Sequence, residues 1–353
     1  MTEVATIRAL GQLLNEGLVF DATTNTGLTN HLPMALVAKA ALGAEPDELS
    51  RFAKKYRSRL TMVDGSGHRL TSATWRRAIG EPSAYGDLVN YFNGEVGEHG
   101  VDETLRRHLN HLVAGVAGAA FHGVIRLAYA LDAEETRRVA SGLAYLAASA
   151  VTLGPLEAGP VTTDDPESLF DELARDERWR SVTPARTIFE EMRRVASDPA
   201  FSRVVASLLL DEHTPRRLAA AALKVYASTD DFTALHGVTG LEALSKIRPY
   251  VDDAEQFDRF TFQALTAAYL SIGAPMVFSR DQLDSLVERM ALDDSTVRAR
   301  AAMSDDAHVA KIVFTSTRLN ESSGDPLYRA VAERAVLGET TDLDDARGRS
   351  VER

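Results

Sequence analysis

Apolar residues recur at helical spacing along almost the whole chain. Near the N-terminus, Ile7, Leu10 and Leu14 repeat every three or four positions, which places them on one face of a helix. The same spacing continues as far as residue 337. We find neither the strict alternation that is typical of a half-buried strand nor a hairpin signal. The pattern therefore predicts an all-α protein, built as a multi-helix bundle.

Capping residues, glycines and prolines divide this pattern into separate helices. Asn30 is expected to cap the second helix, with Pro33 in its first turn. Residues 101–131 are rich in alanine and glycine at their centre, so this long helix is expected in the middle of the bundle, where neighbours pack closely. The predicted helices are 3–17, 30–43, 46–56, 71–80, 84–95, 101–131, 133–152, 184–197, 199–210, 214–227, 230–247, 252–272, 280–291, 294–318 and 326–337.

The connections are expected to be polar loops at residues 21–30 and 57–70 and a longer link, with a short helix inside it, at 154–182. We predict one α-helical domain over residues 1–320. Residues 321–353 would add a C-terminal helix and a charged tail, ETTDLDDARGRSVER, which is expected to be disordered. Paired helices leave a solenoid as an alternative, although no repeat of fixed period is found.

Charge and composition exclude several classes of function. The 353 residues include 39 basic and 51 acidic side chains, a formal net charge of −12, so neither nucleic acid nor a membrane surface is an expected partner. The absence of cysteine excludes disulfides, thiolate zinc sites and iron–sulfur clusters. No signal-peptide pattern and no apolar run of roughly 20 residues is found, so we expect a cytoplasmic protein. Its oligomeric state is left open.

Common catalytic motifs are also missing from the sequence. It contains no Walker A loop, no GxSxG, no HExxH and no Glu-x-x-His pair, and its single GSG triplet does not continue into GxGxxG. Nucleotide cofactors bound in these ways and a carboxylate-bridged di-iron centre are therefore poorly supported.

The nine histidines fall into three groups. His68, His99 and His213 lie in polar contexts and are expected at the surface. His108 and His111 form an HxxH pair that could bind a metal. His111 and His122 are separated by roughly 16 Å along the helix axis, so one metal cannot bind both, and either this pair or His122 forms a site. The remaining four lie in apolar stretches of four different predicted helices: His31, His122, His236 and His308. Such a histidine is either satisfied by a backbone carbonyl or carboxylate, or is part of a metal site in the bundle core.

The segment DDAHVAK, residues 305–311, adds a lysine to this set. His308 and Lys311 are three positions apart and project from one face of a helix. Four neutral imidazoles would leave a divalent metal without a counter-charge, and no carboxylate stands out as a ligand inside the four apolar stretches. A buried lysine becomes neutral more easily and can react with carbon dioxide to form a carbamate, an anionic oxygen ligand. A surface histidine and a solvated lysine remain the alternative.

Four pieces of this chain, in order, resemble the questin oxidase-like family: NHLPMALVAKAALGAEPDEL, FHGVIRLAYAL, LHGVTGLEAL and DDAHVAK. The resemblance runs from about residue 20 to about residue 315. It implies a mononuclear non-haem iron, with ligands carried over as His31, His122, His236, His308 and a carboxylated Lys311. Members of the family often carry further histidines before the first of these, where this chain has TGLTN. Residues 135–230 match loosely, and substrate choice is expected to depend on them.

We therefore expect a dioxygenase that uses ferrous iron (Fe2+) and dioxygen to open a ring of an anthraquinone- or anthrone-type aromatic polyketide. Carbon dioxide would carboxylate Lys311, and the need for an external reductant such as NADPH is left open. Arg126 is a candidate for contacting a substrate phenolate, and Asp305 and Asp306 are candidates for orienting a ligand imidazole. The alternatives are a metal-dependent hydrolase with a carbamylated lysine and a non-catalytic α-helical binding protein.

Overall fold

The computed structural model describes residues 2–65, 67–133, 135–182 and 185–338. Within these ranges the chain forms 17 α-helices and one two-stranded sheet, so the predicted all-α class is confirmed. None of the described helices combines the length and apolar character needed to cross a membrane. The tail that was expected to be disordered, residues 339–353, lies outside the described residues, and the division at residue 320 stays a prediction.

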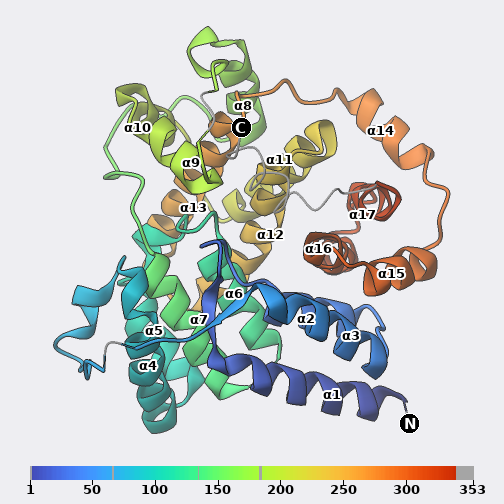
Figure 1. Ribbon diagram of the computed structural model, residues 1–353. Coiled ribbons are helices and arrows are strands. Elements are labelled where there is room, and N and C mark those ends of the chain that lie inside the picture. The colour runs from blue at the N-terminus through green and yellow to red at the C-terminus, as the bar shows by residue number, and fades with distance from the viewer. Residues whose placement is uncertain (1, 66, 134, 183–184, 339–353) are drawn as a thin grey trace.

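The N-terminal part contains three helices and the small sheet. Helices α1 (Thr2–Glu16), α2 (Leu32–Ala41) and α3 (Pro46–Tyr56) pack side by side (Figure 1). Strand β1 (Phe20–Thr24) pairs antiparallel with β2 (Leu60–Met62). The prediction that residues 21–30 and 57–70 form loops without strands is therefore wrong. Strands of five and three residues are too short to show a clear alternation of apolar and polar residues.

The long helix predicted over residues 101–131 is two helices. Helix α5 ends at Leu109, and α6 begins at His122 after Ala119, Ala120 and Phe121, which all have positive φ. Gly118 packs against the C-terminal end of α7 (Thr136–Ser149), so closely that a Cβ at Gly118 would lie only 2.0 Å from Ser149 O. The close packing of neighbouring helices that the small residues predicted is confirmed, but it occurs at the break between the two helices. The helices of this region are α4 (Tyr85–His99), α5 (Val101–Leu109), α6 (His122–Asp132) and α7 (Thr136–Ser149).

The helix predicted over residues 294–318 is also interrupted, at residues 304–306. The Asp306 side chain accepts a hydrogen bond from His308 N at 2.7 Å and so caps the helix that follows this interruption. The remaining helices are α8 (Pro166–Arg175), α9 (Ile188–Ala196), α10 (Pro199–Ala206), α11 (Thr214–Thr229), α12 (Phe232–Ile247), α13 (Ala254–Ser271), α14 (Arg280–Glu288), α15 (Asp294–Met303), α16 (Ala307–Ser323) and α17 (Leu327–Leu337).

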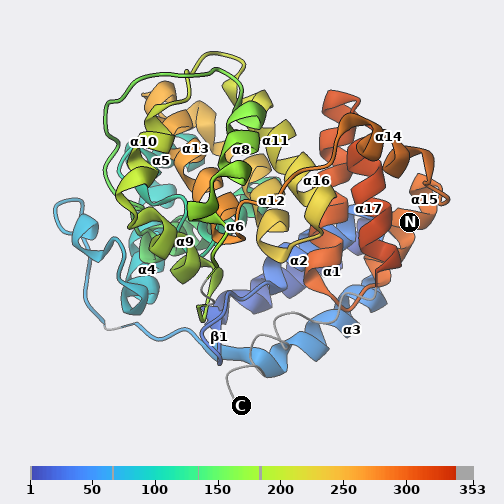
Figure 2. The same ribbon diagram turned by 90° about the horizontal axis from the view of Figure 1, so that it is seen from above.

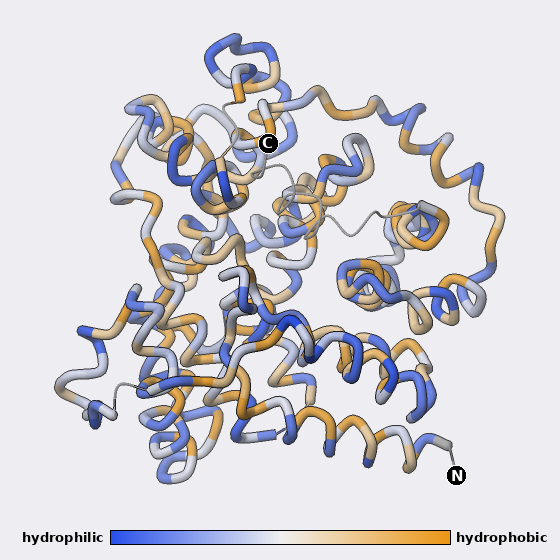
Figure 3. The backbone as a smooth tube through the Cα atoms, viewed as in Figure 1, coloured by the Kyte–Doolittle hydropathy of each residue, from blue (hydrophilic) through white to orange (hydrophobic). Residues whose placement is uncertain are grey.

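Helix α12 lies at the centre of the molecule. It packs against α6, α11, α13 and α16, and nearly all of its residues are buried (Figures 1 and 2). Most surrounding helices carry both hydrophilic and hydrophobic residues (Figure 3), as expected for elements with one face toward a core. Side chains from several helices can therefore meet around α12 in the core.

Candidate metal centre and adjoining cavity

The four histidines in apolar stretches converge at the starts of four helices. His31 immediately precedes α2, His122 is the first residue of α6, His236 lies in the second turn of α12, and His308 is the second residue of α16. All four side chains are buried, with at most 7% of each residue exposed. Because helix N-termini carry partial positive charge, this point in the core favours anions and disfavours protonated imidazoles.

The imidazole rings are in direct contact. The Nε2 atom of His122 lies 2.8 Å from His31 Nε2 and 3.2 Å from His236 Nε2. The ring centroids of His31 and His308 are 4.5 Å apart. One ligand atom from each of His31, His122 and His308 falls within 4.8 Å of the others. The predicted convergence of the four histidines is therefore present in the fold.

Hydrogen bonds hold three of the rings with Nε2 toward the centre. His122 Nδ1 donates to Ala119 O at 2.6 Å, and His236 Nδ1 donates to Phe232 O at 2.7 Å. His308 Nδ1 lies 3.2 Å from the Asp306 carboxylate. With Nδ1 engaged in this way, the free lone pair of each ring is on Nε2, as it is in histidines that bind metals.

Lys311 is fully buried beside these rings, on the same face of α16 as His308. Burial lowers the pKa of His31, His122 and His236 well below the usual histidine value, and the charge of Lys311 lowers it further. Neutral imidazoles are the form that binds metals. The four helix N-termini and the charge of Lys311 create an excess of positive potential, which an anionic ligand would offset.

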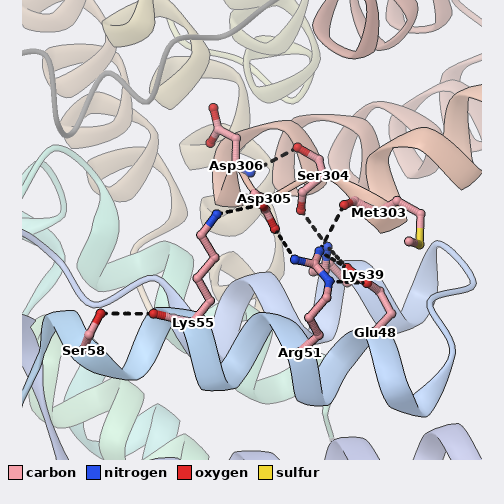
Figure 4. A network of polar contacts seen from close by, with 9 residues as sticks. All are labelled: Lys39, Glu48, Arg51, Lys55, Ser58, Met303, Ser304, Asp305 and Asp306. Carbon is pink, nitrogen blue, oxygen red and sulfur yellow. Dashed lines mark hydrogen bonds and ion pairs between the residues drawn. The ribbon is translucent and has the colours of Figure 1, made fainter.

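Contacts around residues 303–306 fix the start of α16 (Figure 4). The buried Lys39 of α2 donates to Ser304 O at 2.7 Å and pairs with Glu48 of α3 at 3.3 Å. Asp305 pairs with Arg51 and Lys55 of α3, at 2.8 and 2.7 Å. Asp305 therefore ties α16 to α3 and orients no ligand. Asp306 contacts His308, as expected of a residue that orients a ligand.

A cavity of about 350 Å³ adjoins the histidines. His31 and His122 form part of its wall, together with the aromatic side chains of Tyr85, Tyr145 and Phe232. This volume lies within the usual range of small-molecule sites. Small residues make up another part of the wall: Ala22, Gly27, Gly80, Ala119, Ala120 and Ala148. A molecule in this cavity would therefore lie beside two of the four histidines.

These donors suit a metal ion. His308 Nε2 is buried and has no hydrogen-bond partner among the described residues. The close pair formed by His31 Nε2 and His122 Nε2 can make one hydrogen bond at most, whereas a metal would use both lone pairs. Imidazole nitrogens are donors that suit iron, copper, zinc and nickel.

The comparison with protein families agrees with this geometry. The model of the questin oxidase-like family matches residues 28–315, most of the chain. The chain belongs to this family. Membership implies an oxidoreductase and suggests an oxygenase that acts on anthraquinone-type compounds. A search of curated proteins found no match. The matched range includes all four histidines and Lys311.

Other histidines of this questin oxidase-like chain lie elsewhere. His108 is buried, and both of its nitrogens are engaged, with Thr104 O at 2.7 Å and the Tyr91 hydroxyl at 3.1 Å. His111 is exposed. The HxxH pair is therefore not a metal site in this fold. Trp75 packs against His108 in the core and does not line the cavity.

Sequence reasoning missed most of the cavity wall. Thr29 and Tyr145 face each other there through hydroxyls 2.7 Å apart, and neither belongs to a motif or a distinctive pattern. Tyr145 and residues 186–189 of the wall come from the loosely matching range 135–230, where substrate choice was expected to lie. That expectation stays a prediction.

Replacing Asp306 by alanine should weaken metal binding without unfolding the chain. The change removes the helix cap, which costs about 1 kcal/mol, and releases the His308 ring, which should lower metal affinity by about 10- to 100-fold. Titration with ferrous iron under anaerobic conditions measures this. Asp305→Ala is the matched control, because it removes only exposed ion pairs and should leave metal affinity unchanged. Equal affinities of the two variants would contradict the role of Asp306.

The metal-free chain should lose stability as the pH falls below about 6.5. His31, His122 and His236 have lowered pKa values when folded, so the unfolded chain binds more protons in this range. Their stabilisation is complete above the unfolded pKa and is lost toward the folded values. Each contributes a slope of up to about 1.4 kcal/mol per pH unit. Urea unfolding between about pH 7.5 and 5.5 measures it, and His236→Gln should reduce the slope by about one third.

Proposed function

We propose that this chain is a mononuclear iron-dependent oxygenase that oxidatively cleaves a ring of an anthraquinone- or anthrone-type substrate. The observation that carries the proposal is the meeting of four buried histidines and a buried lysine beside a cavity of about 350 Å³. Family membership supports the reaction class. The partner of this site would be a small polycyclic aromatic molecule.

Iron would be held by His31, His122, His236 and His308, with Lys311 as a carbamate. Bound there, it would supply the redox chemistry that lets dioxygen react with an aromatic ring. In forming the carbamate, the neutral Lys311 amine adds to carbon dioxide, a C–N bond forms and one proton leaves to solvent. The side-chain charge changes from 0 to −1, which offsets the positive potential of the four helix N-termini.

The protein's own contribution is orientation and exclusion of water. The apolar walls of the cavity would hold a planar ring system, and two of the proposed ligands, His31 and His122, form part of the wall. Phe232 packs against both His236 and His308, with ring centroids 4.6 Å away in each case, and shields that side from solvent. A dry pocket of this kind strengthens electrostatic interactions with the substrate and limits side reactions.

Metal content and oxygen uptake test this proposal. The untagged chain, purified without oxygen, should contain about one iron per chain by elemental mass spectrometry. It should then consume dioxygen when given a hydroxyanthraquinone or an anthrone, with isotope-labelled oxygen appearing in the product. Assays with and without NADPH decide the need for a reductant. Zinc at about two per chain would instead favour a hydrolase, and failure to bind any metal after addition of ferrous iron and bicarbonate would favour a binding protein.

A further inference from the structure

Arg126 is a buried cation whose hydrogen bonds go to neutral groups. It lies one turn after His122 in α6 and is 7% exposed. Its guanidinium donates to Asn30 O at 3.2 Å, to Ser141 Oγ at 3.4 Å and to the Tyr85 hydroxyl at 3.5 Å. Among the described residues, no carboxylate forms an ion pair with it. Buried charges are normally paired, so we expect a ligand to supply the counter-anion for Arg126.

The cation lies directly behind the cavity wall. Arg126 itself does not line the cavity, but the two tyrosines that it contacts, Tyr85 and Tyr145, do. Its guanidinium carbon is 5.8 Å from the centre of the Tyr145 ring. The positive charge is therefore one layer of side chains away from any molecule in the cavity, in surroundings where little water screens it.

The wall also offers a hydrogen-bond donor beside this charge. The hydroxyls of Tyr145 and Thr29 are 2.7 Å apart and share one hydrogen bond. Two hydroxyls carry two protons, so one proton of the pair remains for a ligand. Burial raises the pKa of Tyr145 to about 12, and the tyrosine therefore stays protonated at neutral pH.

The charged groups of the wall itself cancel. Asp21 and Arg186 are its two charged residues, and the Asp21 carboxylate already accepts hydrogen bonds from Thr23 N at 2.9 Å and Thr23 Oγ1 at 2.8 Å. Since burial lowers the pKa of His31 and His122 in the wall and keeps both neutral, Arg126 leaves the cavity with a net positive surrounding. A ligand that brings one negative charge would be favoured over a neutral ligand of the same shape.

We propose that Tyr145, Thr29 and Arg126 form a subsite for an anionic oxygen, so that the cavity selects aromatic molecules that carry an ionised phenol. Tyr145 or Thr29 would donate a hydrogen bond to the phenolate, and Arg126 would act through the tyrosines as a positioning residue. This inference rests on the proposed function, because it takes the cavity to be the substrate site. It adds the charge state of the substrate and the residues that recognise it.

Binding of 2-hydroxyanthraquinone tests the subsite, because its absorption moves to longer wavelength when the phenol ionises. The full chain is treated with a chelator and titrated without oxygen, so that neither metal nor turnover contributes. A nearby cation should lower the pKa of the bound phenol by about one unit or more. The shift should disappear in Arg126→Met and persist in Arg126→Lys. Arg138→Met is the matched control, since Arg138 is also buried but pairs with Glu135 away from the cavity.

A second variant keeps the test decisive if Arg126→Met does not fold. Tyr145→Phe preserves the ring and removes the hydroxyl, and it should reduce the preference for the phenolate over unsubstituted anthraquinone by about tenfold. An unchanged preference, or an equal pKa shift in wild type and Arg126→Met, would overturn the subsite. Phenolate binding without iron or oxygen uptake would refute the oxygenase alone. Oxygen uptake with no preference for hydroxylated substrates would refute the subsite alone.

Discussion

Lys311→Met should leave the chain folded and remove its ability to hold iron. The thioether side chain fills a similar volume but cannot react with carbon dioxide, so the proposed carbamate donor cannot form. Without metal, the variant should be as stable as wild type or more stable by about 1 to 3 kcal/mol, because replacing a buried charge by an apolar group of similar size is often favourable. Iron content should fall to background and oxygen uptake should stop.

Lys39→Met is the matched control for this variant. Lys39 is the other lysine among the largest fully buried side chains, but it pairs with Glu48 and Ser304 O. Its loss should cost on the order of 3 kcal/mol, since Glu48 stays partly unpaired in the interior. Loss of the bond to Ser304 O loosens the start of α16 but removes no donor atom, so iron binding should weaken and not disappear. Retention of iron and oxygen uptake by Lys311→Met would contradict the assignment of Lys311 as a ligand.

Carboxylation of Lys311 has a direct signature of its own. The metal-free chain reconstituted with ferrous iron should recover activity only when carbon dioxide or bicarbonate is present. With labelled bicarbonate, carbon NMR of a zinc-loaded sample should show one carbamate signal that is missing from Lys311→Met and present in Lys39→Met. Full activity in buffer free of carbon dioxide, after dialysis of the metal-free chain, would argue for an uncarboxylated site.

His122→Ala should abolish iron binding more completely than any other single histidine change. His122 contacts both His31 and His236 through Nε2, so it joins the two halves of the site. Loss of a ligand should lower affinity by more than the 100-fold that a supporting residue can cost. The cavity left by the ring should cost on the order of 2 to 4 kcal/mol in unfolding free energy.

The stability cost alone does not identify a ligand, and His108→Ala supplies the comparison. His108 is equally buried and has both nitrogens engaged by protein groups. Its replacement should destabilise the chain by a similar amount and leave iron content and oxygen uptake per folded molecule intact. Equal losses of iron in the two variants would mean that His122 acts through the fold.

Most of the helices and the burial of the four histidines could be predicted from the local sequence pattern. Amphipathic spacing and capping residues determine the helices, and the three-residue spacing of His308 and Lys311 puts both on one face of α16. The apolar contexts of His31, His122, His236 and His308 indicated burial, and all four are buried. These features depend on neighbours within a few positions, which is the range that hydrophobic periodicity reports.

The breaks in the two longest predicted helices were decided by tertiary contacts. Phe121 has a φ of 67°, and its ring fills the place where a side chain on Gly240 of α12 would stand. This packing between residues far apart in sequence offsets the cost of positive φ and starts α6 at His122. Similarly, Lys39 and α3 hold the break before α16 through contacts that no local pattern shows.

Contacts between distant segments also decide three further features. These are the different roles of Asp305 and Asp306, the hydrogen-bonded ring of His108, and the cavity wall around Tyr145. Each is set by which groups from distant segments come within hydrogen-bond or packing distance. The sequence by itself determined an all-α chain with buried histidines and a lysine one turn from the last of them. Only the tertiary structure decided that they meet, because convergence of side chains depends on how helices pack and not on how each helix forms.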